Sequence, residues 1–137
     1  AGPFGDGVAY TDTEHSKIVV LMTDGQNQNS NPGGSNSNAS YYSSIGYIWQ
    51  NRLGITSGSD TTRRTAMDSR LSTLCTNMKA KGIQIYTVGV EVTTGSSTVL
   101  KNCASSPDMF YDVQDSSQLL ATFQSIAGEI SKLRISK

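Results

Sequence analysis

The sequence predicts an α/β fold, a three-layer α/β/α sandwich of Rossmann-like type with about three parallel strands. Two observations predict it. Three short segments are rich in β-branched and aromatic residues, as strands are. Each is followed by a segment with apolar residues at every third or fourth position, as on one face of a helix. Strands that alternate with helices pair in parallel and carry helices on both faces. With 137 residues, the chain has the length of one domain.

The first predicted strand covers residues 18–22, a continuous apolar run. We expect it to be buried on both faces, because helices cover both sides of a parallel sheet. It stops at the turn Thr23-Asp24-Gly25. Residues 26–60 are then rich in Asn, Ser and Gly. Because a structureless loop of that length is uncommon in a compact domain, we expect an insertion with a short helical or hairpin piece near residues 45–53.

A helix is predicted after residue 60, because Met67, Leu71, Leu74 and Met78 recur at the spacing of one helix face. Gly82 follows two lysines, as a left-handed helix cap does.

The remaining predicted elements are a strand at 83–92, a turn at 93–97, a short helix at 98–104, a strand at 109–113 and a final helix from 115 or 116. The apolar stripe of that last helix is Leu119, Phe123, Ile126, Ile130 and Leu133.

Three strands are few for such a sheet, and the first is too apolar for an exposed edge. We therefore expect residues 1–137 to be a partial domain, half of a doubly wound fold cut from a longer protein. If instead the chain truly begins at residue 1, the edge of strand 18–22 must be covered by a second copy, forming a homodimer, or by residues 7–11 folding back.

Charge and hydropathy exclude two classes of partner. The 11 Lys and Arg balance the 11 Asp and Glu, and clustered uncompensated cations are what nucleic acid requires. No apolar run approaches the roughly 20 residues that cross a bilayer. We expect neither nucleic-acid binding nor membrane insertion. His15 reads as a solvated loop residue, since no nucleophile motif accompanies it.

Asp24 is the candidate functional carboxylate, because ligands of open α/β sheets bind beyond the carboxyl ends of the strands. Two interpretations stand. The side chain could accept backbone N–H bonds and close its own turn, or it could face a divalent cation. One carboxylate cannot hold Mg²⁺, which takes six oxygen ligands.

Cys75 and Cys103 fall on predicted helices that flank the same strand. A disulfide between them is geometrically plausible. The alternative is two buried thiols that pack as small apolar groups.

The run KIVVLMTDG at residues 17–25 resembles the fourth strand and following turn of von Willebrand factor A (vWA) domains. In that family the Asp of this turn belongs to the metal-ion-dependent adhesion site. Residues 74–90, 100–113 and 116–136 resemble the C-terminal region of TadG-like proteins of the bacterial Tad pilus. The resemblance covers most of the chain from residue 17 and includes both cysteines.

The chain departs from the vWA pattern at the metal site. The family motif Asp-x-Ser-x-Ser is absent, and the nearest string, which begins at Asp115, fails at its last position. Only Asp24 matches a metal-site position, since Thr23 is not the ligand Thr of the family. The resemblance therefore implies no cofactor in this fragment, and Mg²⁺ in the full-length domain.

The resemblance also implies a function, that of a non-enzymatic binding module in pilus assembly or adhesion through protein contact. Its place would be the periplasmic or extracellular side of the cell envelope, with the full-length protein membrane-anchored. Such compartments sustain disulfides, which favours the bridge.

Two alternatives are a structural scaffold with a degenerate metal site and a metal-dependent phosphatase built around Asp24. The phosphatase lacks a second acid, a base and a phosphate loop. Finally, Tyr41, Tyr42, Tyr47 and Trp49 could form a partner or sugar contact surface, or could pin the insertion to the domain.

Overall fold

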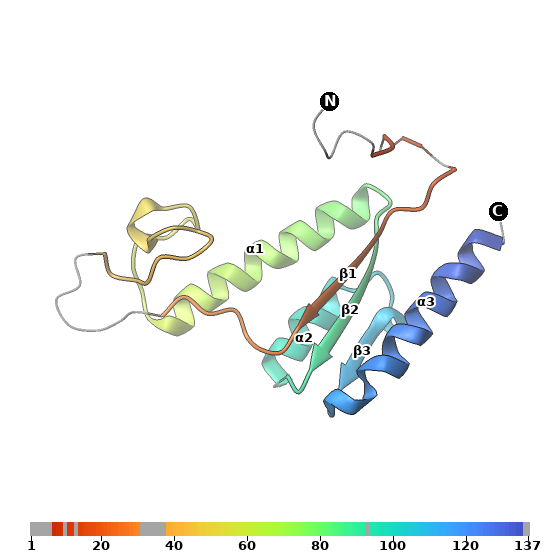
Figure 1. The fold of residues 1–137 in the computed structure, drawn as a ribbon. Helices are drawn as coiled ribbons and strands as arrows, with labels where there is room; N and C mark the ends of the chain where they lie inside the picture. Colours follow the sequence, from red (N-terminus) through yellow and green to blue (C-terminus); the bar gives the residue numbers. More distant parts are fainter. Residues whose placement is uncertain (1–6, 10, 13, 31–37, 93, 136–137) are drawn as a thin grey trace.

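The computed structural model describes residues 7–9, 11–12, 14–30, 38–92 and 94–135. Strands and helices alternate along the chain (Figure 1). They are β1 (Ile18–Thr23), α1 (Asp60–Ala80), β2 (Gln84–Val90), α2 (Thr94–Cys103), β3 (Phe110–Val113) and α3 (Leu119–Ile135). Three short 3-10 turns accompany them, at Ile48–Gln50, Pro107–Met109 and Ser116–Gln118.

The three strands form one parallel sheet in the order β1-β2-β3. Helices α1 and α2 lie on one face and α3 on the other (Figure 1). The predicted α/β sandwich with three parallel strands is confirmed. Its physical basis is the alternation of short segments rich in β-branched and aromatic residues with segments whose apolar residues recur at every third or fourth position.

Alternate residues of β2 divide the core into two clusters, because successive side chains of a strand point to opposite faces. Ile85 packs with the two cysteines below α1 and α2. Tyr86 and Val88 pack with Ile126 of α3. All of these side chains are buried, so β2 is the strand that is covered on both faces.

The expectation that the first strand is buried on both faces is wrong. β1 lies at the edge of the sheet, where Val20 is 41% exposed and Met22 is 52% exposed. In register they pair with Tyr86 and Val88, so they share the face that α3 covers farther along the sheet. The clusters place α3 against β2 and β3, and these two side chains of β1 remain uncovered.

The fold-back over this edge is not formed by the described residues. Residues 7–9 are exposed, and β1 has a strand ladder only with β2 among the described segments. Residue 10 of the expected segment lies outside the described residues.

Other differences from the sequence analysis are local. Residues 94–97, expected in a turn, form the start of α2, and β2 ends at Val90 rather than 92. Leu74 of the expected apolar stripe is exposed, and Cys75 beside it is buried instead. The short turn Ile48–Gln50 confirms the helical piece expected near residues 45–53.

Candidate functional site

Asp24 lies in the bend directly after β1, and its side chain is exposed. The Thr23 hydroxyl closes this turn. Its Oγ1 donates to the carbonyl oxygen of Gly25 at 3.1 Å, and the Gly25 N–H donates back to Oγ1 at 3.2 Å. Asp24 therefore faces solvent at the carboxyl end of a parallel strand, where ligands of such sheets bind.

The described residues contain no group of three or more His, Cys, Asp and Glu side chains arranged to hold a metal ion. Among these residues Asp24 belongs to no such group, whereas a Mg²⁺ site needs six oxygen ligands in octahedral geometry. The described residues therefore do not fit a Mg²⁺ site.

A cavity of about 410 Å³ lies beside this turn, between β1, α1 and α2. Its apolar lining includes Leu21, Leu71, Val99 and Leu100, and its polar lining includes Gln26, Asn27, Arg64 and Asp68. The loop after β1 and helix α1 meet at this lining. Arg64 Nη1 donates to Gln26 Oε1 at 2.7 Å, and Asn27 Nδ2 donates to Asp68 Oδ1 at 2.8 Å.

The sequence patterns that predict the fold do not single out Arg64 and Asp68 as site residues. They lie at i and i+4 on α1, one turn apart, on the flank of the apolar stripe. That spacing marks a shared helix face, but nothing local reveals that the loop 26–27 covers it.

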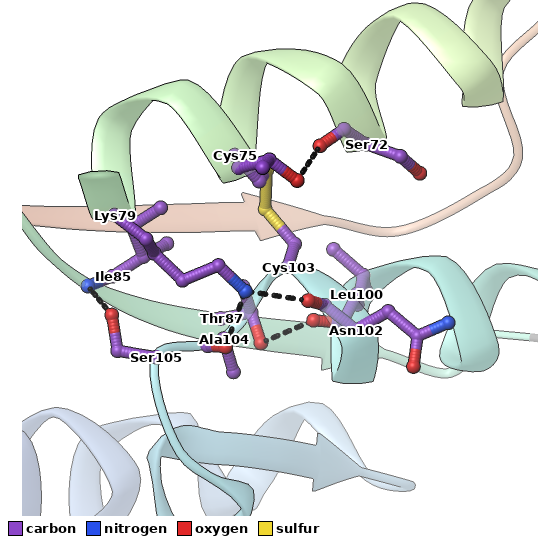
Figure 2. The surroundings of a disulfide bond; sticks show 11 residues. Ser72, Cys75, Lys79, Ile85, Thr87, Leu100, Asn102, Cys103, Ala104 and Ser105 are labelled. Carbon is purple, nitrogen blue, oxygen red and sulfur yellow. Dashed lines mark hydrogen bonds between the residues drawn. A yellow bond between two sulfur atoms is a disulfide. The ribbon is translucent and has the colours of Figure 1, made fainter.

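Cys75 and Cys103 form a disulfide that ties α1 to α2, with their Cα atoms 5.2 Å apart. Both residues are 1% exposed. Figure 2 shows the hydrogen bonds around the bridge. Lys79 Nζ donates to the carbonyl oxygens of Asn102 at 2.9 Å and Ala104 at 3.2 Å. The bridge is thus a buried structural link in the layer above β2.

Hydrogen bonds on both sides of Cys103 join the chain to the central strand. The Ile85 N–H donates to Ser105 Oγ at 2.8 Å, and the Thr87 hydroxyl donates to the Leu100 carbonyl oxygen at 3.0 Å (Figure 2). Thr87 is fully buried, and a buried hydroxyl needs such a partner.

The structure brings three of the four candidate aromatic residues together. The rings of Tyr42 and Tyr47 meet edge to face at 5.2 Å, and those of Tyr47 and Trp49 are stacked at 6.4 Å. Tyr41, Tyr42 and Trp49 are exposed. Trp49 Nε1 donates to Asn38 Oδ1 at 3.4 Å. The cluster presents aromatic surface to solvent and is itself part of the packing of the insertion.

Arg63 anchors the insertion to α1, a role that was not predicted from the sequence. Its side chain is 1% exposed. Nε donates to the Gly58 carbonyl oxygen at 2.9 Å, and Nη1 donates to Asn29 Oδ1 at 3.4 Å. The available signal was its spacing, because residue 63 lies four positions before Met67 and extends the same stripe.

Two ionisable pairs lie away from the cavity. His15 is exposed, and its Nδ1 lies 3.1 Å from Asp12 Oδ1. Hydrogen bonding to His15 lowers the pKa of the Asp12 carboxyl. Between β3 and α3, the Tyr111 hydroxyl donates to Glu129 Oε1 at 3.2 Å. Burial raises the pKa of Tyr111, and the nearby Glu129 charge raises it further. Neither pair lines the cavity beside β1.

In the part of the chain that the structure describes, no helix combines the length and the hydropathy needed to cross a bilayer. Comparisons with protein-family models, with curated proteins and with solved structures find no match to this chain. The class of protein defined by fold and site is thus a small parallel α/β domain with a cavity at the carboxyl end of its edge strand.

Proposed function

We propose that this chain is a binding module of the bacterial cell envelope, the C-terminal half of a vWA domain like those of TadG-like pilus proteins. It acts in pilus assembly or adhesion through protein contact, without catalysis. The edge strand β1, whose apolar Val20 and Met22 are exposed, supports a half-domain, because the strands of the other half would pair there. The observation that supports protein contact most is the exposure of Tyr41, Tyr42 and Trp49 in the insertion. The buried disulfide supports an oxidising compartment.

An exposed strand edge is a template on which a further strand can add. In the whole vWA domain the N-terminal half would supply that strand and bury the apolar side chains beside the edge. The partner is a pilus or envelope protein that contacts the exposed aromatic rings, whereas residues 1–137 alone would pair with a second copy through β1. The full-length protein is proposed to be membrane-anchored on the outer side of the envelope.

Site-specific photo-crosslinking tests this proposal in cells that express the protein natively. A photoreactive residue at Trp49, which is 52% exposed, should crosslink to a defined envelope protein. Val8 is the matched control, because it is 40% exposed and lies outside the insertion. Equal crosslinking at both positions, or none at Trp49, would refute protein contact through the aromatic residues.

The structural scaffold is a second candidate, and one observation favours it. The described residues do not assemble a metal-ligand cluster around Asp24. Titration calorimetry with Mg²⁺ separates the candidates. If the module is a metal-dependent adhesion domain, Mg²⁺ should bind to a longer protein that includes an Asp-x-Ser-x-Ser segment, and Asp24→Ala should abolish that binding. If the module is a scaffold, Mg²⁺ should bind neither to residues 1–137 nor to the longer protein.

A further inference from the structure

The lining of the cavity at the end of β1 combines apolar side chains with two opposite charges. The apolar side chains include Leu21, Leu71 and Leu100, and Leu100 is buried. The charged side chains are Arg64 and Asp68. The volume of about 410 Å³ is that of pockets that hold small organic molecules.

Arg64 and Asp68 lie one helical turn apart, a spacing at which opposite charges commonly pair. They form no ion pair in the described structure. Each is held instead by a neutral amide, Arg64 by Gln26 and Asp68 by Asn27. Both charged side chains are half-buried.

Neutral amides do not compensate the charge of a partly desolvated side chain as an opposite charge does. A guanidinium has five N–H donors, and a carboxylate accepts several hydrogen bonds. Each group therefore has capacity for a charged ligand atom beyond the one amide contact. A ligand with a single charge would satisfy only one of the two.

We propose that this cavity binds a small zwitterion with an apolar side chain, of the free α-amino acid class. The ligand carboxylate accepts hydrogen bonds from the Arg64 guanidinium, and the ligand ammonium donates to the Asp68 carboxylate. The ligand side chain packs on Leu21 and Leu71. This inference does not depend on the proposed protein contact, which uses the exposed aromatic rings of the insertion.

The test is an NMR titration of the whole chain with L-leucine and two blocked analogues. Leucinamide lacks the carboxylate and N-acetyl-leucine lacks the ammonium. L-Leucine should shift the amides of residues 23–27 and the methyls of Leu71 and Leu100 in a saturable manner. Each analogue should bind at least about tenfold more weakly, as expected for one lost charged contact.

Variants assign the two charges separately. Arg64→Gln should bind leucinamide as tightly as L-leucine, while N-acetyl-leucine still binds more weakly than L-leucine. Asp68→Asn should bind N-acetyl-leucine as tightly as L-leucine, while leucinamide still binds more weakly. Arg64→Lys should retain binding of L-leucine. Arg70→Gln is the matched control, because Arg70 lies on the same helix and donates to the Arg52 carbonyl oxygen away from the cavity.

The proposal is overturned if L-leucine gives no saturable shifts in the unmodified chain, or if both analogues bind as tightly as L-leucine. It is also overturned if Arg70→Gln weakens binding as much as Arg64→Gln does. The comparison of ligands on the unmodified chain decides the matter even if a variant fails to fold.

Discussion

Removal of the Cys75–Cys103 disulfide should cost this domain a large part of its stability. The bridge joins residues 28 positions apart in sequence. In the chain-entropy model, closing a loop of that length stabilises the folded state by about 3.6 kcal/mol. Small domains have a free energy of unfolding of only about 5–15 kcal/mol. The bridge is therefore expected to decide whether the fold is fully populated at elevated temperature.

The perturbation is Cys75→Ala, Cys103→Ala and the double variant. Because either substitution opens the same loop, each single variant should lose nearly as much stability as the double variant. Urea denaturation followed by far-UV circular dichroism measures this loss. With a urea m-value of about 1.5 kcal/mol/M, the midpoint should fall by about 2.4 M. The m-value itself should rise, because the unlinked unfolded chain is more expanded.

Thr76→Ala is the control, since Thr76 is an exposed neighbour of Cys75 on α1 and surface substitutions change stability by about 0.5 kcal/mol or less. Losses of the single variants that add up in the double variant would refute the reasoning, because independent side chains, not a shared loop, would then account for them. A loss below about 1 kcal/mol in the double variant would refute it as well, since it is far smaller than the loop-closure term.

Three further predictions concern other parts of the fold. Gly89→Ala should destabilise by about 2 kcal/mol, because the added Cβ would lie 2.7 Å from Val92 Cγ2. Val92→Ala should restore part of that loss in urea denaturation, and no restoration would contradict the contact. Arg63→Met keeps the side-chain bulk and loses the hydrogen bonds to the insertion. It should cost about 2 kcal/mol and speed proteolysis within residues 38–58, whereas unchanged cleavage would show that the anchor is dispensable. Burial and the Glu129 charge raise the pKa of the Tyr111 phenol in the folded state. The stabilisation that this gives is complete below the ordinary pKa of about 10 and is lost as the pH rises through the raised value. Glu129→Gln should lower that pKa, so that phenolate absorbance and loss of stability both begin at lower pH. A titration curve identical to that of the unmodified chain would refute the role of Glu129.

The order of the strands and helices could be predicted from the sequence, because the pattern of apolar residues in each segment indicates the element that this segment forms. The run at 18–22, the stripe from Met67 to Met78 and the β-branched residues after Gly82 all form the elements that their patterns predict. The start of α2 could not, since the Thr, Gly and Ser residues at 94–97 have weak helix propensity, and it is the folded structure that makes them helical.

The candidate site could be predicted only in part. The turn at Asp24 follows from the strand that precedes it, and its place at the carboxyl end follows from parallel pairing. The cavity could not be predicted, because Arg64 and Asp68 meet Gln26 and Asn27 from 38 and 41 residues away in sequence.

The sequence by itself determined the strands, the helices and the parallel arrangement, because the local pattern of apolar residues indicates which side chains of each segment tend to be buried. Only the tertiary structure decided which face of each element is covered by another element. β1 has the composition of a central strand and lies at an edge, and Arg63 has the composition of a surface residue and is buried. In both cases burial depends on which distant element packs against the side chain, and residue type alone does not carry that information.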